Sequence, residues 1–335
     1  MGGQRDVDDA PPITAYGFDA SLTNFEGMGP KLLPLTLKPG DKKPGRIWQD
    51  AERLGNGYRW MQRSEITGGF VDAALPFIDR AQKNGQPFYI NLWPDDVHTP
   101  LWPPVDQWAD GKRGLYLAVL EEMDRQLARL FDRVRNDPKL RNNTLILVCS
   151  DNGPEVGCGS PGPFKGSKAT LFEAGIRSPL VVWGPGLIPA GKAGTRNTTS
   201  TFSAIDLVPS LLKITNTPAP DGVQFDGEVL ADTLLGKSTD SRQAPIPFRR
   251  PPDRANFRHY KQLPDLAIRA GKWKLLCDYD GGNPQLHDLS QDPGEMTNLA
   301  AQEPERVQEL TAGILKWHKS MPPDNGPQME GAGAR

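Results

Sequence analysis

An apolar stretch that ends abruptly in a polar turn most constrains how this chain folds. Residues 145–149 read Leu-Ile-Leu-Val-Cys, without alternation of polar and apolar side chains, and Ser-Asp-Asn-Gly follows at 150–153. Such a continuous apolar run predicts a central strand covered on both faces. At its carboxyl end, where α/β proteins commonly bind ligands, Asp151 and Asn152 offer two hard oxygen donors. The turn therefore predicts either a site for Ca²⁺ or Mg²⁺ or an ordinary Asx-turn.

Other periodic segments predict the remaining elements of an α/β layered fold. We expect further strands at Phe88–Trp93 and Pro179–Trp183, and helices at 64–83, 115–134 and 201–214. The helix at 115–134 repeats apolar residues at steps of three and four, so we expect it to lie on the sheet. The Gly- and Pro-rich residues 1–60 are expected to be loop, and residues 217–262 a long connection.

The last part of the chain predicts a small α+β subdomain. Short strands are expected at 267–269, 273–277 and 285–289, and a helix at 304–319. Residues 321–335 are expected to be a frayed tail. We therefore divide the chain into a catalytic-domain part, residues 1–240, and a C-terminal subdomain of short antiparallel strands and a helix, residues 241–335.

Three motifs occur in an order that is typical of one enzyme family. His98-Thr-Pro100 follows the first expected strand, and Ser150-Asp-Asn-Gly153 follows the next. Gly166-Ser-Lys-Ala-Thr170 then precedes Glu173-Ala-Gly-Ile-Arg-Ser-Pro179. Together with Gly271-Lys-Trp-Lys274 and Asp292-Pro-Gly-Glu-Met-Thr-Asn-Leu299, this set resembles the formylglycine-dependent, arylsulfatase-like sulfatases of the alkaline phosphatase superfamily. The resemblance implies a mixed sheet flanked by helices and the hydrolysis of sulfate esters of a carbohydrate or an aryl alcohol.

The resemblance also implies a role for each motif residue. Asp151 and Asn152 would bind a calcium ion, and Lys168 would place its positive charge against the sulfate oxygens. His98 would hydrogen-bond the sulfate or protonate the leaving alcohol. Lys165 is a second candidate for the role of Lys168. Asp95, Asp96 and Trp102 flank His98 and could line the substrate subsite, whereas Glu173 and Arg177 are expected to pair structurally.

The nucleophile of the family is not found among the three cysteines. In the family a Cys or Ser followed by x-Pro/Ala-x-Arg becomes formylglycine, and Cys149, Cys158 and Cys277 all lack this context. The resemblance begins in mid-fold, because Met1-Gly-Gly3 matches the residues just after the family's Gly-Lys-Trp-His. We therefore expect a sulfatase fragment that lacks the first strands, the paired metal-binding aspartates and the nucleophile, and that is inactive by itself.

Composition limits the remaining function classes. The net charge is −2, which predicts no nucleic-acid partner, and no apolar run reaches the roughly 20 residues needed to span a bilayer. We expect a sulfated small molecule or glycan as partner and no membrane. No signal peptide is seen at the N-terminus, so the compartment stays open, although full-length members of the family are commonly periplasmic or secreted.

Two other functions stay open at this point. One is hydrolysis of phosphodiesters or phosphonate esters by the same superfamily, although only four histidines are available for a two-metal site. The other is a non-catalytic remnant or binding scaffold, which a missing first strand would leave with an exposed sheet edge.

Overall fold

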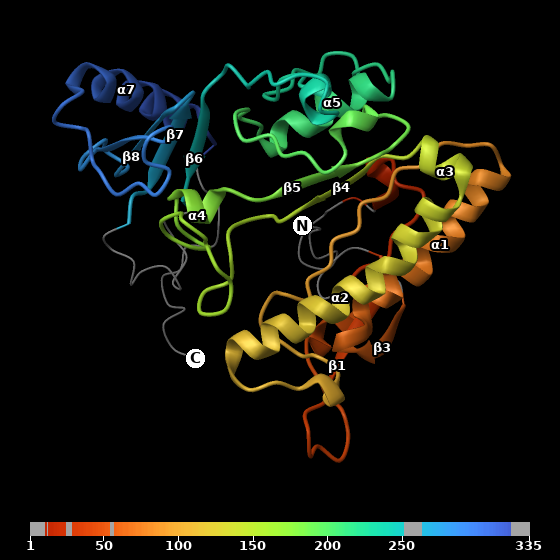
Figure 1. Cartoon of the computed structure of the whole chain (residues 1–335). Helices are drawn as coiled ribbons and strands as arrows, with labels where there is room; N and C mark the ends of the chain where they lie inside the picture. The colour runs from red at the N-terminus through yellow and green to blue at the C-terminus, as the bar shows by residue number, and fades with distance from the viewer. Residues whose placement is uncertain (1–10, 12, 25–28, 54–56, 251–262, 323–335) are drawn as a thin grey trace. The chain divides into compact units, whose positions relative to one another are not determined.

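The computed structural model describes residues 11, 13–24, 29–53, 57–250 and 263–322 (Figure 1). The chain divides into two compact units, and each is described here by itself. The first contains residues 1–140 with 157–159, and the second contains 141–156 with 160–335. The predicted α/β class is confirmed, because the described chain combines β-sheets with α-helices. The predicted boundary near residue 240 lies inside the second unit and stays a prediction.

A three-stranded sheet in the first unit corrects the expectation that residues 1–60 are loop. β1 (Lys31–Thr36) pairs in parallel with β3 (Tyr58–Gln62) and antiparallel with β2 (Gly45–Arg46). Leu32 and Leu33 of β1 are fully buried. β1 is hard to recognise in the sequence because Pro34 cannot donate a ladder hydrogen bond and normally argues against a strand.

Two long helices form the other layer of the first unit. α1 (Ile66–Lys83) and α2 (Gly111–Asn136) match the predicted helices and run alongside each other in Figure 1. Their contact is partly polar: Gln126 accepts a hydrogen bond from the Gly68 N–H, and Arg129 pairs with Asp72. Of the apolar positions that predicted this helix, Val134 is buried but Leu120 is 37% exposed, and the polar Glu122 and Gln126 are buried as well.

The predicted strand at Phe88–Trp93 is also wrong. These residues form no strand, although exposed and half-buried side chains alternate along them, as in extended chain. Tyr89 is 61% and Trp93 73% exposed. Within the described residues no neighbouring strand supplies the ladder hydrogen bonds that define a sheet, so the apolar pattern alone did not suffice.

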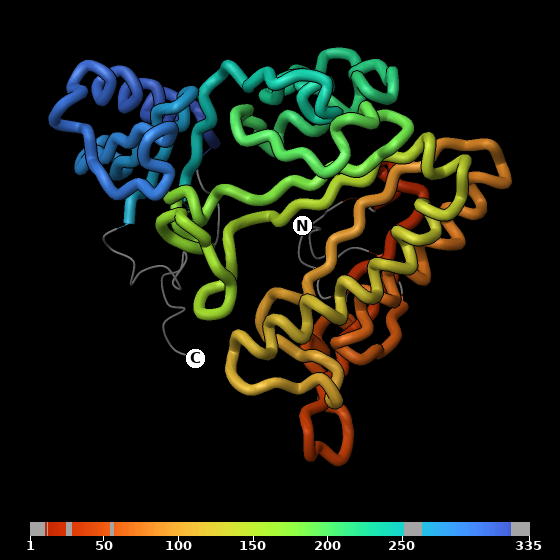
Figure 2. The backbone as a smooth tube through the Cα atoms, viewed as in Figure 1, coloured from red at the N-terminus to blue at the C-terminus, as the bar shows by residue number. Residues whose placement is uncertain are grey.

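A two-stranded ribbon opens the second unit. β4 (Ile146–Cys149) pairs antiparallel with β5 (Leu180–Trp183), as Figure 1 shows. Both strands were predicted, but their expected burial is wrong: Val148 is 45% and Val181 59% exposed. The reason is that the described chain places no third strand beside this pair. Between β4 and β5 the backbone leaves the ribbon in a long excursion (Figure 2), and this segment contains Asp151, Asn152 and Lys168.

Residues 201–250 join the ribbon to the C-terminal sheet. The predicted helix at 201–214 is present as a 3-10 turn, Ala204–Asp206, followed by α5 (Leu207–Ile214). The expected connection at 217–262 instead contains α6 (Ala231–Leu234) and β6 (Ile246–Arg249), and its residues 251–262 lie outside the described chain. A buried ion pair between Asp206 and Arg242 connects the two ends of this segment. The predicted tail likewise falls largely outside the described residues.

The predicted strands and helix of the C-terminal part are confirmed. β6, β7 (Leu266–Ala270), β8 (Trp273–Cys277) and β9 (Gln285–Asp288) form an antiparallel sheet in sequence order. α7 (Pro304–Ser320) covers it through Leu310 and Ile314, which are buried against Leu275 and Leu286. In Figure 1 this blue helix lies along the blue strands. No helix in the described ranges is both long and apolar enough to cross a membrane.

The remaining short elements complete the description. α3 spans Pro138–Asn142 and α4 spans Glu173–Ile176. Further 3-10 turns lie at Ile13–Tyr16, Gln49–Arg53, Arg63–Glu65, Val105–Gln107 and Ala190–Lys192.

Candidate active-site loops

The Asp-Asn-Gly turn directly follows β4, as the sequence predicted. Asp151 is exposed, Asn152 is half-buried and Gly153 is buried. The amide Nδ2 of Asn152 donates to the carbonyl oxygen of Gly153 at 3.1 Å. The hydroxyls of Ser150 and Ser178 both donate to the carbonyl oxygen of Asn152, at 2.9 and 3.4 Å. The turn is therefore held through its backbone and the Asn152 NH₂ group.

Glycine is required where this turn meets α4. The N–H of Gly153 donates to the carbonyl oxygen of Gly175 at 3.0 Å. A Cβ at Gly153 would overlap the carbonyl oxygen of Ala174, and a Cβ at Gly175 would overlap that of Thr170. Only residues without side chains allow backbones to approach this closely. The backbones of the Asp-Asn-Gly turn and of α4 are consequently in direct contact.

The Lys168 loop is a tight turn that contacts the same segment. The Thr170 hydroxyl donates to the Ser167 carbonyl oxygen at 2.8 Å, and the Lys168 N–H donates to the carbonyl oxygen of Pro154 at 3.3 Å. The backbone of Ala169 has φ of 74°, a left-handed conformation that costs a non-glycine residue about 1–2 kcal/mol. The structure thus brings the predicted Lys168 loop beside the predicted Asp151–Asn152 turn.

The two candidate lysines have different surroundings. The ammonium Nζ of Lys168 is 3.7 Å from Glu155 Oε2, and its side chain is 31% exposed. Nζ of Lys165 instead donates to the Glu295 carbonyl oxygen at 3.4 Å and lies 4.2 Å from the centre of the Phe172 ring. Lys165 is therefore committed to the packing of the C-terminal part, whereas Lys168 stays beside the Asp-Asn-Gly turn.

The chemistry of this turn suits a hard cation in part. The Asp151 carboxylate and the side-chain oxygen of Asn152 are donors of the type that Ca²⁺ prefers. Ca²⁺ takes about 6–8 oxygen ligands, and the described residues contain no cluster of three or more His, Cys, Asp and Glu side chains that could hold a metal. These two side chains therefore fit as members of a cation site and do not complete it.

The loop that carries His98 is anchored in the first unit by a buried arginine. Arg63, whose side chain is 2% exposed, donates to Asp95 Oδ1 at 2.8 Å and to the Asp95 carbonyl oxygen at 2.7 Å. Asn24 adds a hydrogen bond to the same carboxylate oxygen. The imidazole of His98 is exposed, and its Nδ1 is 2.7 Å from the Thr99 carbonyl oxygen. Because that oxygen can only accept, Nδ1 carries the proton and Nε2 is left to act as acid or base.

The residues that flank His98 make contacts within the protein that hold its loop in place. Asp96 is buried and accepts a hydrogen bond from the Thr67 hydroxyl, and burial raises the pKa of its carboxyl group. Trp102 packs edge-on against Trp108, with their ring centres 5.6 Å apart. The placement of Asp95 and Asp96 thus supports an anchoring role, and a substrate contact by these residues stays a prediction.

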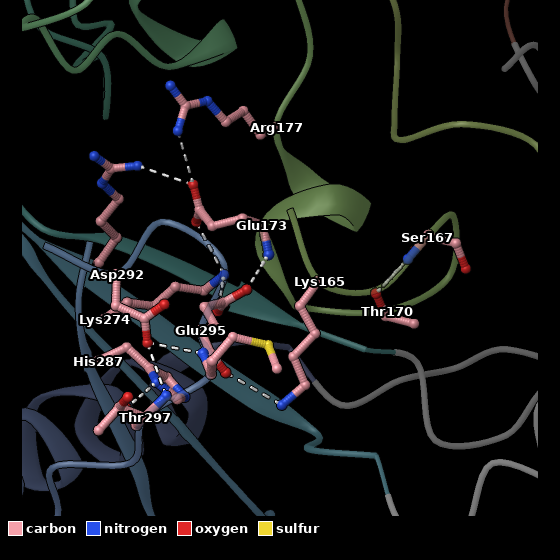
Figure 3. A network of polar contacts seen from close by, with 12 residues as sticks. Lys165, Ser167, Thr170, Glu173, Arg177, Lys274, His287, Asp292, Glu295 and Thr297 are labelled. Carbon is pink, nitrogen blue, oxygen red and sulfur yellow. Dashed lines mark hydrogen bonds and ion pairs between the residues drawn. The ribbon is translucent and has the colours of Figure 1, made fainter. Parts of the chain in front are cut away.

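A buried polar network contains residues for which we predicted only a structural role or none from the sequence (Figure 3). Lys274 Nζ lies 3.0 Å from Glu173 Oε1 and 2.9 Å from Glu295 Oε1, and all three side chains are at most 1% exposed. The predicted pair of Glu173 and Arg177 is confirmed at 3.6 Å. Lys274 and Glu295 belong to motifs that signalled the family, but their mutual contact has no signal in local sequence.

His287 is a buried histidine of the C-terminal sheet. It lies in β9 and is 2% exposed. Its Nδ1 is 2.8 Å from the Thr297 carbonyl oxygen, and Nε2 has no hydrogen-bond partner among the described residues. Burial lowers the pKa of this imidazole, because a second ring proton would be a buried charge without an acceptor.

Comparison with protein families gives two matches that together cover most of the chain. The sulfatase family model matches residues 47–217. The model of the C-terminal region of N-sulphoglucosamine sulphohydrolase matches residues 164–319. The second match therefore contains the Lys168 loop, the Glu173–Lys274–Glu295 network and the C-terminal sheet.

Individual relatives agree with the family models. An N-acetylgalactosamine-6-O-sulfatase of Bacteroides thetaiotaomicron is 31% identical over 312 residues, which cover 82% of this chain and 56% of the relative. Arylsulfatase G of Rattus norvegicus is 32% identical over 285 residues, which cover 76% of this chain and 51% of the relative. The chain thus spans about half the length of these relatives.

Solved structures confirm the predicted fold. A structure described in connection with glycosaminoglycan metabolism by Bacteroides thetaiotaomicron superposes with a TM-score of 0.64 at 25% identity, covering 83% of this chain and 60% of that one. A sulfatase from Pseudoalteromonas sp. gives a TM-score of 0.61 at 21% identity, covering 81% and 59%. The second likeness speaks for the fold alone.

Proposed function

Because this chain belongs to the sulfatase family, we propose that it supplies the sulfate-binding part of an active site that hydrolyses sulfate esters of a carbohydrate. One observation supports the proposal: the N–H of Lys168 donates to the carbonyl oxygen of Pro154, next to the Asp151–Asn152 turn, while the N–H of Gly153 in that turn donates to Gly175 of α4. The loop that carries a lysine is thereby held against the turn that carries two oxygen donors. A lysine and oxygen donors are the groups that a sulfate group and a hard cation require.

We assign Lys168 to the sulfate oxygens. In the structure its ammonium faces Glu155 at 3.7 Å, a distance typical of a loose ion pair. A sulfate ester with its negative charge would compete with Glu155 for this ammonium. The charge of Lys168 would then stabilise the negative charge that develops on the sulfate oxygens during ester cleavage.

We assign Asp151 and Asn152 to a Ca²⁺ ion, together with ligands beyond this pair. When bound, the cation supplies Lewis-acid polarisation of the ester. A hydrogen bond supports this role: the NH₂ group of Asn152 donates to the carbonyl oxygen of Gly153, so its side-chain oxygen would be the ligand atom.

We assign His98 to the leaving-group oxygen of the ester. Its Nδ1 is fixed by the Thr99 carbonyl oxygen, so a protonated ring presents the N–H of Nε2 as an acid. None of the cysteines at 149, 158 and 277 is assigned as nucleophile, because none lies in the sequence context of formylglycine.

Calorimetric titration tests this proposal with N-acetylgalactosamine 6-sulfate as the probe and unsulfated N-acetylgalactosamine as its control. We expect the sulfated sugar to bind more tightly, and CaCl₂ to increase its affinity. Lys168→Ala should weaken binding about tenfold, the loss of one partly exposed charge-assisted contact. Lys192→Ala removes an exposed lysine outside the loops and should change nothing.

Equal affinity for both sugars, or an unchanged affinity in Lys168→Ala, would contradict the proposal. Tighter binding of a phosphonate monoester than of the sulfated sugar would favour the alternative hydrolase of the same superfamily. Absence of binding to any of these ligands by the folded chain would favour a non-catalytic scaffold.

A further inference from the structure

We propose that Glu173, Lys274 and Glu295 form a positioning device for Lys168, so that the C-terminal sheet sets the geometry of the sulfate-binding loop. The inference rests on the function proposed for Lys168. It is carried by the buried network in Figure 3, in which a loop of the 165–177 segment, a strand of the sheet and the segment after β9 meet through charged groups.

Two positively charged side chains of the C-terminal sheet lie next to each other. Arg269 of β7 and Lys274 of β8 are direct cross-strand neighbours on one face. Like charges in this position repel each other. Glu173 relieves the repulsion, because its Oε1 is 3.0 Å from Lys274 Nζ and its Oε2 is 3.3 Å from Arg269 Nη1. The carboxylate that the sheet needs is thus supplied by the segment that carries Lys168.

Glu173 is also held through its backbone. Its N–H donates to Glu295 Oε2 at 2.6 Å, while the other carboxylate oxygen of Glu295 faces Lys274. The next N–H, that of Ala174, donates to the carbonyl oxygen of Lys165 at 2.9 Å. A displacement of Glu173 would therefore move the residue that begins the Lys168 loop.

The position of Glu295 is fixed by hydrogen bonds of the backbone turn to which it belongs. Its backbone has φ of 53°, and its N–H donates to the Asp292 carbonyl oxygen at 3.2 Å. The Asp292 carboxylate accepts the next two N–H groups, of Met296 and Thr297, at 2.8 and 2.7 Å. The Glu295 carbonyl oxygen accepts a hydrogen bond from Lys165 Nζ. The network therefore contacts the Lys168 loop at both ends, at Lys165 and at Glu173.

Apolar packing supports the same joint. Leu171 and Phe172, between Lys168 and Glu173, are buried against Ala267 of β7 and Leu276 of β8. A purely apolar joint would suffice to attach the segment to the sheet. The additional charged groups fix its direction, because hydrogen bonds and ion pairs depend on orientation and apolar contacts do not.

Hydrogen–deuterium exchange of Lys274→Met tests the proposal without any ligand. We expect peptides from 165–175 to exchange about tenfold faster than in the wild type, and peptides from α7 to keep their rates. Glu295→Gln keeps the shape of the side chain and should give the same pattern more weakly, which covers the case that Lys274→Met fails to fold. Lys272→Met is the matched control, since Lys272 is half-exposed and pairs with Asp288 outside the network.

Binding of N-acetylgalactosamine 6-sulfate gives the second readout. Lys274→Met should lose about as much affinity as Lys168→Ala, and the double variant should lose no more than either, because both changes remove one interaction. Unchanged exchange at 165–175 in either folded network variant, or additive losses in the double variant, would overturn the proposal. If the wild type does not bind the sulfated sugar, the proposed function fails, and the exchange experiment still decides whether the network positions the loop.

Discussion

At the scale of single residues, two glycines allow the loops of the site to pack together. Gly153 and Gly175 sit where the backbones of the Asp-Asn-Gly turn and of α4 come too close for a side chain. Neither residue has a left-handed φ, so the requirement is one of space and not of backbone conformation. The family motifs contained both glycines, but only the structure gives the physical reason for them.

Gly153→Ala should therefore lower the free energy of unfolding by about 1–3 kcal/mol, because the new methyl group must displace the backbone of α4. Chemical denaturation measures the loss. Gly191→Ala is a suitable control, since a Cβ there meets no atom within 4 Å, and it should change stability by less than about 0.5 kcal/mol. An equal effect of the two substitutions would show that the turn does not pack on α4 as described.

At the scale of elements, the β4–β5 ribbon is the least usual feature of the second unit. Val148 and Val181 are cross-strand partners on one face of the ribbon, and Cys149 and Leu180 are partners on the other. All four are exposed, so the ribbon is apolar on both faces. Isolated two-stranded ribbons are marginally stable, and apolar strands left open are sites of association.

The double variant Val148→Thr, Val181→Thr tests this exposure. We expect less binding of an apolar dye and less self-association in light scattering, with a change in unfolding free energy of at most about 1 kcal/mol, because little buried area is lost. Leu276→Ala, at a fully buried position of β8, should cost about 2–5 kcal/mol. A comparable cost for the threonine variant would mean that the valines are packed in solution.

The same scale shows what local sequence can predict. The antiparallel strands and the helix of residues 265–320 were predicted almost to the residue, because short turns link neighbouring strands and pattern alone defines them. Phe88–Trp93 has an equally clear apolar pattern and forms no strand, since pairing depends on a distant partner. β1 was not predicted because it contains a proline, and because its pairing with β3 leaves no signal in its own sequence.

The candidate site follows a similar rule. Asp151, Asn152 and Lys168 come from motifs close together in sequence, and the structure brings their loops into contact. The residues that support them do not come from one segment: Lys274 is 101 residues from Glu173, and Glu295 is 122 residues from it. Contacts between residues so far apart in the sequence depend on the whole fold. A local sequence pattern can therefore predict these residues but not the contact between them.

At the scale of the whole molecule, the chain spans about half the length of the relatives that it matches. The second unit holds the ribbon, both site loops and the C-terminal sheet, and the first unit holds His98 on a loop anchored by Arg63. We propose that the loops at 151–153 and 165–170 together bind the sulfate group of a sulfated carbohydrate.

The most direct test of that claim is an NMR titration of the ¹⁵N-labelled chain with N-acetylgalactosamine 6-sulfate in the presence of CaCl₂. We expect the largest amide shift changes in residues 151–153 and 165–170, and we expect the unsulfated sugar to leave the shifts of these amides unchanged. Shift changes centred elsewhere in the chain, or equal changes with both sugars, would contradict it.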